Sequence, residues 1–281
     1  MTVDSRLRGN DVYVTPIREE KPLADPLVSY TEDGPIAIVT ISNPPKNVLT
    51  IPLIEAFETV VEDLEKKDAI KAIVITGSGP IFIAGADIKV IASITSSEAG
   101  EKLARRGQAL FNKIEQMQKV VIAAINGYCL GGGMELAMAC HLRILGERVR
   151  MGQPEINLGI IPGFGGTQRL PRIVGQAKAI ELILSGDMIN AEEAKRIGLA
   201  NKVVPEGEVL KQALGLAKKI GSKSRCAIEA IMKAIEEGMN EPLSIGLGRE
   251  AQLFGKICQT EDMREGITAF LEKRQPKFQD K

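Results

Sequence analysis

Aromatic residues, histidine and paired cysteines are scarce in this sequence of 281 residues, and each scarcity excludes a kind of site. There is no tryptophan, aromatic residues amount to 4%, and His141 is the single histidine. One imidazole cannot build a histidine-rich metal site, and any Ser–His or Cys–His catalytic scheme would have to run through it. The four cysteines form no CxxC pair, which argues against a zinc or redox motif and favours a reducing, cytoplasmic location. Acid–base chemistry in this chain would therefore fall to carboxylates.

A net charge and a long apolar run are also lacking. Lys plus Arg and Asp plus Glu both number 36, so the formal net charge is +0. A neutral chain has no overall electrostatic attraction to nucleic acid, and we expect no nucleic-acid partner. Without about 18 consecutive apolar residues we expect no membrane span. Residues 1–26 carry both charge signs and no apolar core of a signal peptide, which indicates a poorly ordered leader or an early start codon.

Strand and helix patterns alternate along the rest of the chain. Two β-rich runs between residues 27 and 42 flank an Asp33-Gly34 pair, which is typical of a hairpin turn. Apolar positions recur at helical spacing in residues 51–67. No linker or low-complexity tract interrupts the later strands and helices, so the sequence predicts one α/β domain with a helical tail.

Two segments of very small residues follow predicted strands. Gly131–Gly133 lies between a strand and a helix, where glycine allows a sharp turn and where free helical N–H groups attract an anion or a developing oxyanion. Ala84, Gly85 and Ala86 would likewise let a ligand lie against backbone N–H groups. Each segment has an alternative interpretation as a tight connection, with Asp87 acting as a helix cap in the second.

Two isolated carboxylates lie in apolar surroundings of the sequence. Glu135 follows the glycines inside MELAMA, and Glu155 lies in GQPEINLG. Burial of such a group raises the pKa of the carboxyl toward the range that is useful for proton transfer. The alternatives are a glutamate that complements the helix dipole and a loop carboxylate that caps backbone N–H groups. Together, two acids and two amide-rich turns match the needs of chemistry α to a thioester carbonyl.

The segments AAINGYCLGGGMELAMAC and MGQPEINLGIIPGFGGTQRLPR closely resemble the signature of the enoyl-CoA hydratase (crotonase) superfamily. The resemblance extends over NPPKNVLT, FIAGADIK, SGDMINAEEAKRIGLANKVVP and EGITAFLEKRQPKF, and covers roughly residues 27–281. It implies an α/β crotonase (ClpP-like) fold, a spiral of ββα units. The implied organisation is a core domain over residues 27–205 and a helical trimerisation region over residues 206–281. It also implies a homotrimer or a homohexamer built as a dimer of trimers.

The resemblance further assigns roles to particular residues. Glu135 and Glu155 match the two catalytic glutamates of hydratases, and Ala86 and Gly132 match the positions whose N–H groups form the oxyanion hole. The implied substrate is an acyl-CoA thioester, so coenzyme A is part of the substrate and no separate cofactor or metal is expected. The implied contacts to this substrate are Lys46, Ala84, Ala86, Asp87, Ile88, Lys89 and Gly132, with Phe270 and Lys273 reaching from a neighbouring subunit.

The glutamate pair favours reversible hydration of a trans-2-enoyl-CoA, as part of fatty acid or related acyl-CoA metabolism. Superfamily isomerases typically keep the second glutamate alone, so an isomerase or a bifunctional enzyme is the alternative within the superfamily. A non-catalytic scaffold or an RNA-binding member is a second alternative, although LARRGQALFNKI has only a modest basic cluster. Many relatives have Asp where this chain has His141, and we interpret that difference as a structural change at a helix end.

Apolar residues recur at helical spacing after Arg249. From the residues alone, this stripe would cover either the chain's own core or a neighbouring surface, and own-core packing is the simpler interpretation. The resemblance reverses that preference, because this region forms trimer contacts in relatives. The stripe consists of Leu253, Phe254, Ile257, Met263, Ile267, Phe270 and Leu271.

Overall fold

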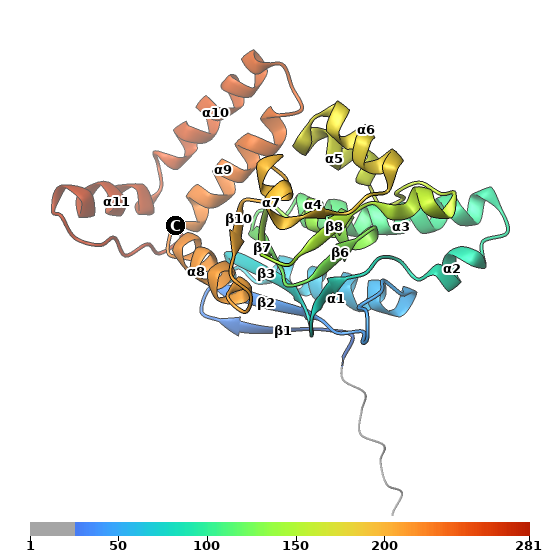
Figure 1. The fold of residues 1–281 in the computed structure, drawn as a ribbon. Helices are drawn as coiled ribbons and strands as arrows, with labels where there is room; N and C mark the ends of the chain where they lie inside the picture. Colours follow the sequence, from blue (N-terminus) through green and yellow to red (C-terminus); the bar gives the residue numbers. More distant parts are fainter. Residues whose placement is uncertain (1–25) are drawn as a thin grey trace, which may run out of the picture.

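Two β-sheets form the centre of the molecule in this computed structural model, which describes residues 26–281 (Figure 1). The larger sheet has six strands in the order β1-β2-β3-β5-β7-β10, and the smaller has four in the order β4-β6-β8-β9. In the larger sheet only the β1–β2 pair is antiparallel, and in the smaller sheet only the β8–β9 pair is. The strands of both sheets are β1 (Val28–Asp33), β2 (Ile36–Ile41), β3 (Ala72–Gly77), β4 (Ile81–Ile83), β5 (Val120–Ile125), β6 (Tyr128–Leu130), β7 (Leu142–Gly146), β8 (Arg150–Gly152), β9 (Ile189–Asn190) and β10 (Lys202–Val204).

Helices surround the sheets and extend beyond them at the C-terminal end (Figure 1). None of those between residues 26 and 281 has the length and apolarity that crossing a lipid bilayer requires. The helices are α1 (Ile51–Lys66), α2 (Ile88–Ala92), α3 (Ser97–Glu115), α4 (Gly132–Ala139), the 3-10 helix η1 (Pro154–Leu158), α5 (Gly166–Val174), α6 (Gln176–Ser185), α7 (Ala191–Arg196), α8 (Val209–Gly221), α9 (Arg225–Gly238), α10 (Leu243–Ile257) and α11 (Glu261–Leu271).

Successive strands of the chain alternate between the two sheets. β3, β5 and β7 belong to the larger sheet, and each is followed at once by β4, β6 or β8 of the smaller sheet. After each such pair the chain forms one to three helices before the next strand begins. This repetition is a spiral of ββα units, so the predicted fold is confirmed.

The smaller sheet brings three separate segments of the sequence to one edge. β4, β6 and β8 are parallel neighbours, so their carboxyl ends lie side by side. The chain leaves β4 through residues 84–86, leaves β6 through Gly131 into α4, and leaves β8 through Gln153 into η1. The two small-residue segments and both isolated glutamates therefore follow strands that end at the same edge.

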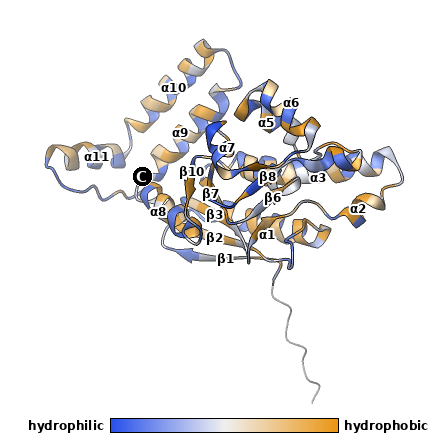
Figure 2. Ribbon diagram, viewed as in Figure 1, coloured by the Kyte–Doolittle hydropathy of each residue, from blue (hydrophilic) through white to orange (hydrophobic). Residues whose placement is uncertain are grey.

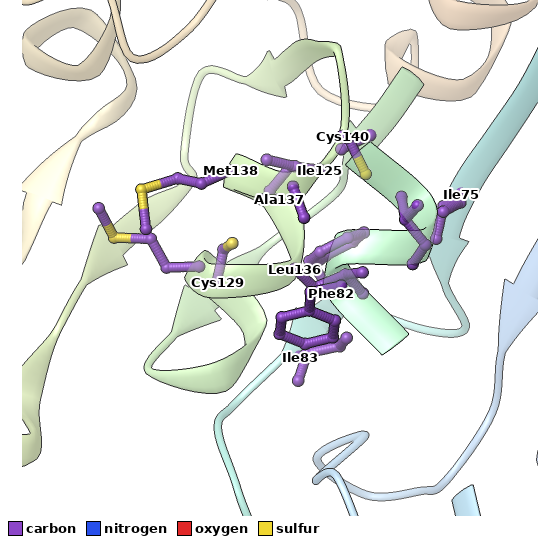
Figure 3. Close-up of a cluster of buried hydrophobic side chains, with 14 of the residues drawn as sticks. Ile75, Phe82, Ile83, Ile125, Cys129, Leu136, Ala137, Met138 and Cys140 are labelled. Atoms are coloured by element: carbon purple, nitrogen blue, oxygen red, sulfur yellow. The ribbon is translucent and has the colours of Figure 1, made fainter. Parts of the chain in front are cut away.

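Helix α4 lies inside the hydrophobic core, and all eight of its residues are buried. Figure 3 shows Leu136, Ala137 and Met138 of this helix among side chains from strands of both sheets. Glycine at the start of α4 allows this close packing, since a Cβ on Gly133 would lie 2.7 Å from the Cβ of Ile83. Because all eight residues of α4 are buried, the position of Glu135 on this helix is fixed by the surrounding core.

The last three helices have little cover from the rest of the chain. α10 packs on α9, and α11 lies apart from both before the chain returns toward α8 (Figure 1). Hydrophobic and hydrophilic residues alternate along these helices in Figure 2, and many of the hydrophobic side chains are exposed. Leu243 is 77% exposed, Phe254 69% and Phe270 81%. Own-core packing of the C-terminal stripe, the simpler interpretation of the residues alone, is therefore wrong for most of these side chains.

Most sequence predictions of elements hold, with errors where strands are short. The hairpin around Asp33-Gly34 and the helix near residues 51–67 are present, and the triple glycine lies at a strand-to-helix junction. The sequence also predicts a single strand over KVVIAAINGY, residues 119–128, and the structure divides this segment between β5 and β6, which belong to different sheets. The predicted leader, apart from Pro26, lies outside the described residues.

Candidate active site

A cavity of about 1090 Å³ opens at the edge where β4, β6 and β8 end. One side is formed by the segments that leave these strands, and the other by α3 and the loop that joins η1 to α5. Most of its wall is apolar, and Glu135 and Glu155 both contribute to it. A pocket with an apolar wall and a small number of polar groups is the usual form of a small-molecule site.

The backbone N–H groups of Ala86 and Gly132 lie next to each other in this wall. An isolated bridge joins Leu49 to the residues around Ala86, through hydrogen bonds from Leu49 N to Gly85 O (2.9 Å) and from Asp87 N to Leu49 O (3.2 Å). Neither bond uses the N–H group of Ala86. N–H groups alternate in direction along an extended segment, so the Ala86 N–H points away from Leu49.

Gly132 supplies the second amide at the first position of α4. The N–H groups of a first helical turn have no partner within the helix. A Cβ placed on Gly132 would lie 3.8 Å from the amide nitrogen of Ala86, so the two backbones approach closely. The arrangement can present two amide donors, together with the helix dipole, to one oxygen atom.

The carboxyl group of Glu135 is buried and accepts two hydrogen bonds from one loop. The Oε1 atom accepts from the backbone N–H groups of Phe164 and Gly166, each at 2.7 Å. The pKa of Glu135 is raised to about 7, mainly by burial; the nearby Glu155 carboxyl also raises it, whereas the two amide donors lower it. A carboxyl that titrates near neutral pH is suited to accept and return a proton.

Glu155 presents a carboxyl without comparable support. It lies in the first turn of η1, and within residues 26–281 its buried Oε2 atom has no hydrogen-bond partner. Burial raises the pKa of this carboxyl above its usual value. A buried carboxylate oxygen that lacks a donor favours the protonated form of the group, so Glu155 is suited to donate a proton.

The turn at Gly131 connects the two acids. Its φ of 51° and ψ of −125° suit glycine, and a Cβ there would lie 2.9 Å from the Oε1 atom of Glu155. Its carbonyl oxygen accepts from the Glu135 N–H at 3.0 Å and from the fully buried Gln153 side chain at 3.0 Å. Its own N–H donates to the Gly152 carbonyl at 2.9 Å. The peptide that carries the Gly132 N–H is therefore held at its carbonyl oxygen, and the peptide before it is held at the Gly131 N–H.

The cavity wall includes some of the residues predicted to contact the substrate and leaves out others. Lys46, Ala84, Ala86, Ile88 and Gly132 all contribute to it. Asp87 instead caps α2 by accepting a hydrogen bond from the Lys89 N–H at 2.9 Å, as its alternative interpretation requires, and the Lys89 side chain is exposed. Phe270 and Lys273 lie at the end of α11, away from this cavity, and their predicted contact with a neighbouring subunit stays a prediction. Across residues 26–281, His, Cys, Asp and Glu side chains form no group of three that could hold a metal ion.

His141 has a structural position just beyond α4. Its Nδ1 atom accepts from the Val121 N–H at 2.8 Å, and its Nε2 atom lies 2.9 Å from the Glu115 carbonyl oxygen. Both contacts require the neutral ring with the proton on Nε2. The imidazole therefore joins α3 to β5, in agreement with its interpretation as a structural feature at a helix end.

Sequence reasoning missed the partners that hold the acids. The hydrogen-bond donors to Glu135 are backbone N–H groups in GFGG. The side chain of Gln153, two residues before Glu155, donates to the Gly131 carbonyl, and this contact was also missed. The glycine content of residues 163–166 was an available signal, because such a loop can turn several N–H groups toward one acceptor. No sequence signal paired that loop with Glu135, since 29 residues separate Glu135 from Phe164.

A ββα spiral whose cavity combines two buried acids with paired backbone amides defines a protein of the crotonase class. The family model for enoyl-CoA hydratase/isomerase matches residues 31–281. This chain therefore belongs to the enoyl-CoA hydratase/isomerase family, and the predicted superfamily is confirmed.

Individual relatives agree with this assignment. The chain is 45% identical to a probable enoyl-CoA hydratase of Bacillus subtilis over 89% of this chain and 98% of that protein. It is 44% identical to the crotonyl-CoA hydratase of Syntrophomonas wolfei over 86% of this chain and 94% of that protein. Among solved structures, an enoyl-CoA hydratase from Bacillus anthracis has a TM-score of 0.87 at 35% identity, with 91% of this chain and all of that chain covered. These relatives are all described as hydratases, in agreement with the predicted hydratase branch of the superfamily.

Proposed function

We propose that this protein is an enoyl-CoA hydratase that adds water reversibly across the C2–C3 double bond of a trans-2-enoyl-CoA. The observation that carries the proposal is the placement of Glu135 and Glu155 in one cavity beside the amides of Ala86 and Gly132. The names of the relatives support the same reaction, since those from Bacillus subtilis, Clostridium acetobutylicum and Syntrophomonas wolfei are all described as hydratases.

The proposed reaction uses both acids and both amides. The Glu135 carboxylate removes a proton from water while the water oxygen bonds to C3 of the substrate. The π electrons of the C2–C3 bond move toward the thioester carbonyl, whose oxygen gains negative charge and accepts from the N–H groups of Ala86 and Gly132. Glu155 then gives its proton to C2, which forms the 3-hydroxyacyl-CoA. The carboxyl environments support this division, because Glu135 has two amide donors that stabilise its charged form and the Oε2 of Glu155 has none.

The test is the rate of hydration by two isosteric variants. Glu135→Gln and Glu155→Gln keep the shape of each side chain but cannot transfer the proton, so each is expected to lower turnover by at least about 10²-fold. The exposed Glu147→Gln, on the turn between β7 and β8, is the matched control and is expected to leave turnover unchanged. Loss of the ultraviolet absorbance of the enoyl thioester measures the reaction. Near-normal hydration by either variant would remove that residue from the proposed mechanism.

The alternative within the family is movement of the double bond by an isomerase or a bifunctional enzyme. Isomerisation needs one proton-transfer group, and this chain places two in the cavity, which favours hydration. Product analysis separates the two reactions, because hydration yields a 3-hydroxyacyl-CoA whereas isomerisation leaves the mass of the substrate unchanged. The RNA-binding alternative depends on the basic cluster of α3. In this cluster Arg105 pairs with Glu101 at 2.6 Å and Arg106 pairs with Glu58 at 2.9 Å, so glutamates neutralise both arginines.

The assembly of the protein is also part of the proposal. Residues 206–281 act as a trimerisation region beside a core domain at residues 27–205. The assembled protein is a homotrimer or a homohexamer. The exposed apolar side chains of α10 and α11 support this assembly, because large uncovered apolar surfaces mark interaction sites. In the assembled protein Phe270 and Lys273 would reach the substrate of the neighbouring subunit. We further propose action in the cytoplasm on acyl-CoA intermediates of fatty acid breakdown, without a metal or a separate cofactor.

A further inference from the structure

Helix α3 has two faces with different partners. On one face Arg105 and Arg106 form ion pairs with nearby glutamates. The opposite face packs against residues 163–166, the loop whose N–H groups bind Glu135. The residues of this second face, named here the loop bed, are Gly107, Gln108, Phe111, Asn112 and Glu115.

Gln108 is connected to Glu135 through a single peptide group. Its side-chain Nε2 donates to the carbonyl oxygen of Gly163 at 2.9 Å. That carbonyl belongs to the same planar peptide as the Phe164 N–H, which donates to the Glu135 Oε1 at 2.7 Å. One rigid group therefore accepts from Gln108 at one end and donates to Glu135 at the other, and a rotation of this peptide would disrupt both hydrogen bonds.

The loop needs external support because glycines flank Phe164. Gly165 has a φ of 115°, a conformation that glycine adopts without strain, and Gly163 and Gly166 also lack side chains that could restrict the backbone. The following peptide already has an anchor, since the buried Arg169 donates from Nη1 to the Phe164 carbonyl at 3.0 Å. The Gly163–Phe164 peptide has Gln108 as its side-chain anchor.

The rest of the loop bed fixes the neighbouring groups. Arg169 is itself held by Asn112 at 2.6 Å and by Glu115 at 2.7 Å. The ring of Phe164 lies over Gly107, where no Cβ could fit, and meets the ring of Phe111 edge-on at 5.8 Å between centroids. The other contacts of the loop bed thus act on the side chain of Phe164 or on the peptide that follows Phe164. Gln108 adds the contact to the peptide that precedes Phe164.

We propose that Gln108 is a positioning residue for the reaction, which fixes the Gly163–Phe164 peptide and through it the orientation and proton affinity of Glu135. The inference rests on the proposed role of Glu135 in hydration. A hydrogen bond to a peptide carbonyl polarises the peptide and strengthens its N–H as a donor. Because the Phe164 N–H lowers the pKa of Glu135, loss of Gln108 raises the pKa of this carboxyl and releases its orientation.

The other charges that face Glu135 do not depend on Gln108. Glu155 on η1 raises the pKa of Glu135, and Arg169 on α5 lowers it. Gln108 on α3 is neutral, so its replacement by another neutral residue leaves this charge balance unchanged. A change in the titration of Glu135 in such a variant would therefore report the hydrogen bond through the peptide.

Two replacements of Gln108 separate its hydrogen bond from its volume. Gln108→Met keeps the length of the side chain and removes the donor, and Gln108→Glu is isosteric but places a carboxylate against the Gly163 carbonyl. We expect kcat to fall by about 10-fold in the Met variant and further in the Glu variant, with KM changed by about twofold at most. The acidic limb of the kcat profile is expected to move to higher pH in both variants. Gln116→Met and Gln116→Glu, at the exposed end of the same helix, are matched controls with wild-type profiles.

Amide hydrogen exchange at Phe164 provides a readout that does not depend on activity. Faster exchange at Phe164 in Gln108→Met, with α3 itself protected as in the wild type, is the expected result. A wild-type pH profile in both variants, or equal activity of Gln108→Glu and the wild type, would overturn the positioning role. If the wild-type protein itself fails to hydrate enoyl-CoA, the proposed function fails, and the exchange result alone then decides whether Gln108 fixes the peptide.

Discussion

Helices α4 and α10 carry apolar side chains in opposite environments. All eight residues of α4 are buried, whereas none of the fifteen residues of α10 is. α4 packs against α3, α5, β4 and β6, and α10 has α9 as its main neighbour (Figures 1 and 3). The two helices therefore show which part of the fold one chain completes alone and which part it leaves uncovered.

This difference separates the position of the proposed catalytic groups from the proposed assembly of the protein. Glu135 is fixed by a core that the chain builds by itself, so its geometry follows from the fold of one subunit. Phe254 and Leu243 on α10 add little to that core, since 69% and 77% of their surfaces are exposed. Under the proposed assembly, apolar residues on α4 determine folding, and those on α10 determine association.

The largest effect is expected from a charge placed on α4. Leu136 is fully buried, so Leu136→Asp would put a carboxylate among apolar side chains and remove their packing partner. We expect the free energy of unfolding to fall by at least about 4 kcal/mol, which leaves most of the protein unfolded or aggregated. Circular dichroism during urea unfolding measures this change. A stable, fully folded variant would contradict the conclusion that packing around α4 is essential for folding.

The matched change on α10 is expected to spare the fold and remove the assembly. Phe254→Asp places the same charge on a side chain that one subunit leaves exposed, so secondary structure should persist. Size exclusion with light scattering should then report a mass near the 30.3 kDa of one chain in place of a trimer or hexamer. Lys256→Asp, on an exposed position of the same helix, controls for the added charge. A wild-type protein that is itself monomeric would contradict the proposed assembly.

Sequence reasoning reached the site because its signals were local. Two glycine-rich or alanine-rich segments and two isolated acids follow strands that end together, and the parallel order of β4, β6 and β8 then brings them to one edge. The partners of these groups come from segments with no local signature. Gln108, for example, lies in a stretch noted only for its arginines, and its contact with Gly163 spans 55 residues.

The fold shows the same division between local and distant information. A long element with clear periodicity, such as α1, lies close to its predicted position. β4, β6 and β8 have three residues each, too few for an alternating pattern to identify a strand. Their existence depends on pairing with one another, which the order of residues along the chain does not reveal.

A third effect follows from the burial of Glu135. Its pKa is raised from 4.5 to about 7, so the folded protein binds this proton more tightly than the unfolded chain. The resulting stability is fully present below pH 4.5 and is lost as pH rises through 7. Glu135→Gln keeps the group neutral at every pH, so it should exceed the wild type in stability at pH 8 by about 3 kcal/mol and match it in acid.

The measurement for Glu135 compares urea unfolding of the two proteins at pH 5 and pH 8, at one protein concentration. Titrating groups that do not interact with Glu135 contribute equally to both proteins and cancel in the difference, whereas Glu155 interacts with it. An advantage of Glu135→Gln that stays constant between the two pH values would show that Glu135 does not titrate in this range. The exposed Glu147→Gln serves again as the control for the substitution itself.

The smallest effect concerns His141, and its sign is opposite. Burial lowers the pKa of this imidazole below 6.5, and protonation of Nδ1 would remove the acceptor of the Val121 N–H. The unfolded chain therefore binds this proton more tightly, so the stability is present above pH 6.5 and is lost as pH falls through the folded-state pKa. In the Glu135→Gln background the opposing titration is absent, and the loss should appear directly. Because His141 is the single histidine, one imidazole resonance in the NMR spectrum reports its pKa, and titration at or above 6.5 would contradict its buried, neutral role.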